Sequence, residues 1–172
     1  MRAVRSRAGV VEVVDIPSPR GDGVRVNVVS AGICGSDLHL LSDVEGVTLG
    51  HEIAGTTEDG TPVAVEPLSP CRICAPCRRG DYNLCETGAA MFHGVAREGG
   101  MADEILVSPA SLVPLPAGID AKEACLVEPI AVAVHGLRRA GLRSDDRVLV
   151  VGGGNIGLCA VAAARTSGAE VA

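Results

Sequence analysis

Aromatic residues are almost absent from this chain, whose 172 residues include one tyrosine, one phenylalanine and no tryptophan. Bases of single-stranded nucleic acids stack on aromatic side chains, and the net charge of −6 opposes contact with a phosphate backbone. Nucleic acid is therefore not an expected partner. No apolar run reaches the length of about 18 residues that a transmembrane helix needs. Residues 1–5 are charged and unlike a signal peptide, so we expect a cytoplasmic protein with no membrane partner.

Cysteine, by contrast, is concentrated in one short segment with the spacing C-x2-C-x2-C-x7-C. This spacing is typical of a tetrahedral zinc site with four thiolate ligands. Disulfides would need an oxidising compartment, and a ferredoxin-type cluster would need three residues before its fourth cysteine. We therefore predict a structural zinc ion, held by Cys71, Cys74, Cys77 and Cys85. A closed four-cysteine site leaves no position for a substrate, so any chemistry must lie elsewhere.

The first 119 residues alternate between short β-rich runs and breaks at glycine or proline, a pattern typical of a small irregular β domain. The expected strands cover residues 10–16, 24–29, 61–65, 104–107 and 111–115, and a helix is expected near residues 36–41. After Asp120 the composition becomes helical. Two short helices, 121–127 and 130–139, are expected on either side of Pro129, which favours extended backbone at Glu128. Gly141 is expected to end the second helix.

The last segment has the order strand, glycine-rich turn, helix and strand, in residues 147–151, 152–157, 158–167 and 169–172. This order is typical of a dinucleotide-binding Rossmann unit. In such a unit the first glycine permits the tight turn, the second admits the pyrophosphate and the third lets the helix pack on the strand. The alternative is an ordinary strand-to-helix turn. The residues predicted to contact the coenzyme are Gly152, Gly154, Ile156 and Gly157.

Two further motifs, in residues 32–39 and 49–55, carry a cysteine and a histidine that would each be weak evidence alone. Together with an acid before a proline, they indicate an open zinc site formed by Cys34, His51 and Glu128. The thiolate and the carboxylate would neutralise the dication, while the neutral imidazole adds no charge. A fourth position would stay free for water or a substrate oxygen, as catalytic zinc requires.

These motifs, in this order, resemble the N-terminal part of the zinc-dependent medium-chain dehydrogenases, the alcohol and polyol dehydrogenase family. The matching segments are 34–39, 50–55, 71–85, 99–104, 128–129 and 152–157. The resemblance implies a mostly β GroES-like domain with a few helices in residues 1–144, followed by a truncated α/β Rossmann segment in residues 145–172. It also implies two zinc ions per chain, NAD or NADP, a small alcohol or polyol substrate, and a homo-oligomer in the full-length form.

The resemblance assigns roles within the open site as well. Cys34, His51 and Glu128 would hold the catalytic zinc, with Cys125 as the rival of Glu128. The acid at the third position places the chain nearer the polyol dehydrogenases than the ethanol type. Glu52 would support the ligands or serve as an occasional fourth ligand, and its alternative is a plain solvated acid.

The remaining roles concern proton movement and ligand orientation. Asp37 would orient His51 through the second nitrogen of its ring. Ser36 and His39 would pass the alcohol proton to solvent, and the alternative for His39 is an ordinary surface residue. His93 and His135 are assigned no role.

The chain also departs from the family pattern. Sixteen residues separate Cys34 from His51, fewer than is usual for the family, so the size of the substrate stays open. Family chains are longer, and the acid that selects NAD over NADP would lie beyond Ala172. The chain is expected to be either a fragment of a longer enzyme or a natural truncation. Two functions follow, a zinc-dependent NAD(P) alcohol or polyol dehydrogenase and a non-catalytic zinc-binding fragment or interaction module.

Overall fold

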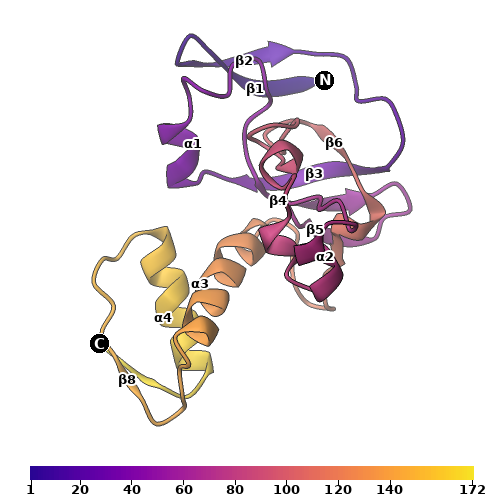
Figure 1. The fold of residues 1–172 in the computed structure, drawn as a ribbon. Helices are drawn as coiled ribbons and strands as arrows, with labels where there is room; N and C mark the ends of the chain where they lie inside the picture. Colours follow the sequence, from indigo (N-terminus) through magenta and orange to yellow (C-terminus); the bar gives the residue numbers. More distant parts are fainter. The chain divides into compact units, whose positions relative to one another are not determined.

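A computed structural model describes all 172 residues and divides them into two compact units, Met1–Cys125 and Leu126–Ala172 (Figure 1). The first unit is mostly β with short helices, and the second is α/β, as the sequence predicts. The division between compact units precedes the predicted domain boundary at 144/145, because helix α3 packs on helix α4 within the second unit. The domain boundary itself stays a prediction.

The first unit contains seven strands, two short α-helices and four 3-10 turns, the last of which ends one residue into the second unit. Its strands are β1 (Arg2–Arg7), β2 (Val10–Asp15), β3 (Val24–Gly32), β4 (Glu52–Thr57), β5 (Pro62–Val65), β6 (Glu104–Val107) and β7 (Leu112–Pro114). Its helices are α1 (Gly35–His39) and α2 (Ala75–Arg79), and its 3-10 turns are η1 (Tyr82–Leu84), η2 (Ala89–Met91), η3 (Pro109–Ser111) and η4 (Ala124–Leu126). The second unit contains α3 (Val127–Arg139), β8 (Arg147–Val148), α4 (Asn155–Thr166) and β9 (Glu170–Val171).

Five strands form one antiparallel sheet in the order β6-β3-β4-β5-β7. Successive side chains on a strand point to opposite faces, so alternate apolar residues of these strands meet in one core. The core residues are Val26, Ile53, Val63, Val65, Ile105 and Val107, all almost fully buried. The candidate site lies where β3 ends and β4 begins, at one edge of these two neighbouring strands.

The N-terminal hairpin β1–β2 turns through Ala8 and Gly9, which both have positive φ, as two-residue hairpin turns favour. Backbone hydrogen bonds attach β1 to two other segments: Val4 N–H donates to Met101 O, and Leu49 N–H donates to Val4 O. The hairpin therefore helps to hold the segment that leads into His51.

The predicted strands of the first unit are confirmed within a few residues, but the sequence analysis missed β1 and β4. β1 carries three arginines and only two apolar residues, which are adjacent, so its sequence shows no alternation. All but one residue of β4 is buried, so its sequence shows no alternation of polar and apolar residues either. The helix expected near residues 36–41 is present as α1.

In the second unit, the prediction that Pro129 separates two helices is wrong. α3 runs through Glu128 and Pro129 without a break, and the preceding segment ends in the 3-10 turn η4. Proline is tolerated here because the N–H groups of the first helical turn have no partner within the helix. Gly141 does follow the helix with positive φ, and its N–H donates to Arg138 O.

The rest of this unit is a small βαβ arrangement in which β8 and β9 pair in parallel around α4. Ala133 on α3 packs with Cys159 and Ala163 on α4. The predicted strand at 147–151 is regular over two residues only, and Leu149 and Val151 are 74 % and 90 % exposed. No helix in either unit combines the length and the apolar character needed to cross a bilayer.

Gly55→Ala is expected to destabilise the first unit by about 1–3 kcal/mol. A Cβ at this position would overlap Asn27 O and lie 2.8 Å from Val26 Cγ1, and neither the backbone nor the packed core can yield cheaply. Gly136→Ala is the control, because a Cβ there meets no atom and alanine favours the helix. Thermal unfolding of both variants measures the difference, and equal stability would contradict the packing of β3 on β4.

Candidate metal centres

The four cysteines of the predicted structural site converge around α2 and η1, with all four sulfurs within 4.8 Å of one another. The Sγ atoms of Cys71 and Cys77 are 4.0 Å apart, as are those of Cys74 and Cys85, far from disulfide bonding distance. All four cysteines are free. This donor set fits a zinc ion, because four sulfurs crowded around one point are stabilised as thiolates only by a cation.

Backbone N–H groups already point at these sulfurs. Cys71 N–H donates to Cys85 Sγ over 3.3 Å, and Cys74 N–H donates to Cys71 Sγ over 3.4 Å. The first of these bonds lowers the pKa of the Cys85 thiol to about 6. The guanidinium of Arg72 lies 4.9 Å above the ring of Tyr82, which anchors the loop between the first two cysteines. The N–H of Cys71 thus favours the thiolate form of Cys85, whereas desolvation raises the pKa of the Cys77 thiol to about 12.

A second group of donors comes from two segments of the first unit and consists of Cys34, His51 and Glu52, again within 4.8 Å of one another. Cys34 is the N-cap of α1, His51 directly precedes β4, and Glu52 is its first residue. His51 and Glu52 are buried and Cys34 is half-buried. A thiolate, an imidazole and a carboxylate form a donor set that suits zinc.

Asp37 connects two of these donors, as predicted for its contact with His51. Its Oδ2 accepts the Cys34 N–H over 2.9 Å, and its Oδ1 lies 3.3 Å from His51 Nδ1. The contact between the Asp37 carboxylate and the imidazole is close and buried. It raises the pKa of His51 to about 9 and leaves Nε2 as the nitrogen available to a metal. A cation at this site would replace that proton.

Burial raises the pKa of Glu52, whose side chain is almost completely enclosed. The sequence also allowed Glu52 to be a plain solvated acid, and its burial shows that this alternative is wrong. His51 and a hydrogen bond with the Cys34 thiol favour the charged carboxylate, but the effect of burial on the pKa of Glu52 is larger than both. The enclosure of Glu52 beside two other donors is a further sign that the residues fit a metal ion.

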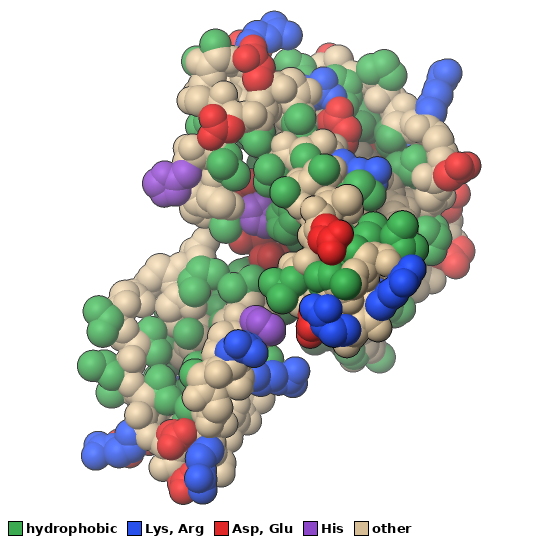
Figure 2. All heavy atoms as spheres, in the orientation of Figure 1, with side chains coloured by type: hydrophobic (Ala, Val, Ile, Leu, Met, Phe, Trp, Pro, Cys, Tyr) green, Lys and Arg blue, Asp and Glu red, His purple; other side chains and the backbone are tan.

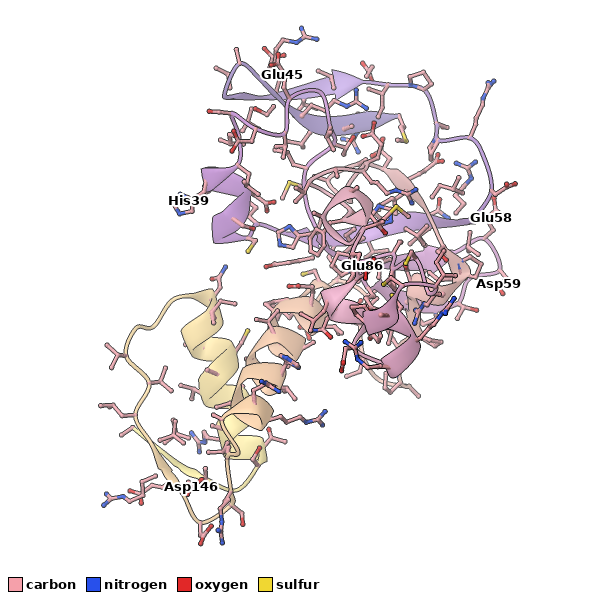
Figure 3. All side chains as sticks on the ribbon, in the orientation of Figure 1. His39, Glu45, Glu58, Asp59, Glu86 and Asp146 are labelled. Carbon is pink, nitrogen blue, oxygen red and sulfur yellow. The ribbon has the colours of Figure 1, made fainter.

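The other residues predicted for this site lie outside the group of three donors. Ser36 and His39 lie on α1, and the side chain of His39 is exposed and points away from the first unit (Figure 3). Their proton relay stays a prediction. Cys125, the rival ligand, is not among the grouped donors. Glu128 lies in the second unit, in the first turn of α3, and its role as a zinc ligand also stays a prediction.

Two residues near the site were given no role from the sequence. Phe92 packs its ring against His51, with the ring centroids 5.7 Å apart. His93 is 3 % exposed, its Nδ1 lies 2.8 Å from Glu98 O, and its Nε2 has no protein partner. The only available signal was that Phe92 is the single phenylalanine of the chain. Both residues lie in a loop without regular periodicity.

The glycine turn has the geometry that the sequence suggested. Gly152 has a φ of +110°, and a Cβ at Gly157 would overlap Gly152 O. Gly154 is the N-cap of α4, a helix of 12 residues, and a Cβ there would meet only open space. The side chain of Ile156 is about half exposed. The turn can therefore admit a phosphate group at the helix N-terminus, while binding itself stays a prediction.

Comparison with known proteins gives one family and a consistent set of relatives. Residues 20–117 match the family described as the alcohol dehydrogenase GroES-like domain. L-galactonate-5-dehydrogenase of Escherichia coli is 36 % identical over 91 % of this chain and 50 % of its own length. Sorbitol dehydrogenase of Arabidopsis thaliana is 37 % identical over 87 % of the chain and 46 % of its own length. The chain thus spans about half the length of these curated relatives.

Solved structures agree with this result. Galactitol-1-phosphate dehydrogenase from Escherichia coli has a TM-score of 0.90 and 32 % identity, covering 99 % of this chain and 54 % of that one. Acetophenone reductase from Geotrichum candidum, in complex with NAD, has a TM-score of 0.86 and 26 % identity, covering 99 % and 55 %. A candidate zinc-binding dehydrogenase from Sinorhizobium meliloti, bound to NADP, has a TM-score of 0.86 and 34 % identity, covering 99 % and 54 %.

We expect two zinc ions per chain that differ in lability. The four-thiolate site should resist a chelator because its coordination is closed, whereas the Cys34–His51 site should lose its ion first. Metal analysis during stepwise chelation measures both ions. Cys34→Ser should remove only the labile ion. A stoichiometry of one that this substitution leaves unchanged would contradict the second site.

The buried His93 should make the first unit less stable in mild acid. Burial lowers the pKa of His93 below its ordinary 6.5, so below about pH 6.5 the unfolded chain takes up a proton that the folded chain resists. Stability is therefore present above this pH and is lost as the pH falls. His93→Asn cannot titrate, so its melting temperature should fall less than that of the wild type between pH 7 and pH 5. Parallel curves would show that His93 stays hydrated or paired.

Proposed function

The chain belongs to the family of the alcohol dehydrogenase GroES-like domain, and from this premise we propose that it is a zinc-dependent dehydrogenase. The reaction would transfer hydride between an alcohol or polyol and NAD or NADP. The observation that supports this most is the buried donor group of Cys34, His51 and Glu52, held by Asp37. Catalytic zinc needs a coordination position open to substrate, which three protein ligands leave free and a closed four-cysteine site does not.

In this proposal Cys34, His51 and Glu128 hold the catalytic zinc ion. Zinc bound there would supply a Lewis acid that lowers the pKa of a substrate hydroxyl. The protein keeps water away by burying His51 and Glu52. Asp37 keeps the imidazole in one orientation. Glu52 is close enough to act as an additional ligand that yields to substrate.

The released proton needs a route to solvent. Ser36 and His39 lie on α1, one half-buried and the other exposed, so a path along this helix would lead outward. The hydride acceptor would be bound through its pyrophosphate at the turn of Gly152, Gly154 and Gly157, with Ile156 beside it. Positioning of the two reactants is the protein's main contribution to such a transfer.

The substrate class is proposed to be small polyols or sugar acids. The names of the relatives from Escherichia coli and Arabidopsis thaliana refer to such molecules, and an acid as third ligand is the pattern that the polyol enzymes share. NAD and NADP are each bound by one of the similar structures, so the coenzyme is either of the two.

The remaining proposals concern the cellular location, the oligomeric state and the partners of the protein. We expect a cytoplasmic protein that forms a homo-oligomer in its full-length form and has neither a nucleic acid nor a membrane as a partner. On the face shown in Figure 2, basic and acidic side chains are intermixed rather than gathered by sign. Such a surface offers no broad attraction to a phosphate backbone.

A second candidate function is a zinc-binding domain without turnover. It is favoured by the second unit, where β8 and β9 are two residues long each and the apolar Leu149 and Val151 are exposed. A coenzyme turn normally rests on a larger parallel sheet. Weak coenzyme binding by this chain would be the consequence.

Glu128→Ala is expected to abolish turnover with little loss of stability, whereas Cys71→Ser should mainly cost stability because the four-thiolate site contributes folding energy. The assay is NAD(P)H absorbance with a panel of polyols, run on this chain and on any longer protein that contains it, alongside thermal unfolding. Comparable residual activity in the two variants would show that the two metal roles are assigned wrongly. Zinc loading without turnover for any polyol would favour the second candidate.

A further inference from the structure

The side chain of Glu52 occupies the space where residue 32 would otherwise have its side chain. Gly32 and Glu52 are directly paired residues of the neighbouring strands β3 and β4. A Cβ built on Gly32 would overlap Glu52 Oε2, and it would lie 3.0 Å from both Cβ and Cδ of Glu52. Real Cβ atoms essentially never come closer than 3.0 Å to another heavy atom in this way. The carboxylate therefore lies directly over the glycine.

The position of the Glu52 side chain explains how the donors of two consecutive residues can lie close together. His51 directly precedes β4 and Glu52 is its first residue, and consecutive side chains in extended backbone point to opposite faces. The donors of both nonetheless lie within 4.8 Å of each other and of Cys34. Glu52 achieves this by folding its side chain across the partner strand, where only the absence of a side chain at Gly32 leaves room.

The pairing of Gly32 with Glu52 depends on an irregularity in β3. Val28 pairs with Gly55, but two residues later Ser30 pairs with Ala54, so the register shifts by one residue. Had the earlier register continued, Ala31 would stand opposite Glu52. A bulge of this kind adds one residue to a strand and re-aims its neighbours. Here it places the glycine opposite the carboxylate.

We propose that Gly32 is a positioning residue for the metal site, which acts through Glu52 by keeping its carboxylate beside Cys34 and His51. The inference rests on the proposed zinc site and adds a residue to it. An alanine at position 32 would overlap the far end of a flexible side chain, so the carboxylate can swing away, and the 3.0 Å approach to Glu52 Cβ needs only a small further shift. The substitution thus displaces a donor while leaving the fold largely intact, unlike a collision with backbone.

The test uses cobalt(II), whose visible absorption reports the number and kind of its ligands. The four-thiolate site of the full chain is first filled with zinc, and cobalt is then titrated into the more labile site. Gly32→Ala is expected to change the ligand-field bands and to weaken cobalt binding by about tenfold or more, the usual effect of disturbing a supporting residue. Its melting temperature in the zinc-loaded form should stay close to that of the wild type.

Two glycine controls separate positioning from general disturbance. Gly35→Ala lies three residues away on α1, where a Cβ would meet no atom, and it should leave both cobalt spectrum and stability unchanged. Gly55→Ala lies on the same sheet and strikes backbone, so it should lower stability without altering the bands. A Gly32→Ala variant that behaves like Gly55→Ala would overturn the proposal.

A double-mutant cycle tests whether the effect passes through Glu52. In a Glu52→Ala background, Gly32→Ala should produce no further change in the bands or in cobalt affinity. A full additional effect there, or wild-type bands in the single variant, would overturn the role of Gly32. A wild type that takes up no cobalt beyond the four-thiolate site would refute the proposed function itself, and with it this inference. The two failures are therefore distinguishable.

Discussion

The candidate site depends most on the carboxylate of Asp37, since one small group holds two ligand-bearing segments. Its Oδ2 caps the backbone of Cys34 at the start of α1, and its Oδ1 faces the imidazole of His51 before β4. The reciprocal capping of a helix N-terminus by its third residue is a local, sequence-encoded interaction. Here the same carboxylate also makes a long-range contact, so the fold of a five-residue helix and the state of the imidazole are coupled.

The segment that precedes His51 is also held by backbone hydrogen bonds. Residues 99–101 run beside residues 48–50, and the N–H groups of Gly99, Gly100 and Met101 donate to the carbonyls of Thr48, Gly50 and Leu49, each over 2.8 Å. A Cβ at Gly99 would overlap all three of these carbonyl oxygens. Glycine is thus required for two backbones to approach this closely, and these hydrogen bonds attach the segment that precedes His51 to residues 99–101.

The features that could be predicted from the sequence are those that depend on the spacing of residues close together in the chain. The four-cysteine loop lies within one short segment, so its spacing alone foretold the grouping of its sulfurs, and the order of motifs foretold the fold class. β4 was missed because nearly all its residues are buried and show no alternation. The break at Pro129 was wrong because a proline in the first helical turn loses no hydrogen bond. The burial of His93 could not be predicted, since it is set by segments distant in sequence.

The position of the Glu52 side chain could not be predicted from the motif that contains this residue. A histidine followed by a glutamate in extended backbone predicts two side chains on opposite faces, which argues for one ligand and one bystander. The grouping of both donors arises from a bulge in β3 and from the missing side chain of Gly32, on a different strand. Neither feature adjoins the motif in sequence, and each has meaning only once the strands are paired. The strand register therefore decides whether this carboxylate can reach a metal ion, and register is a property of the folded sheet.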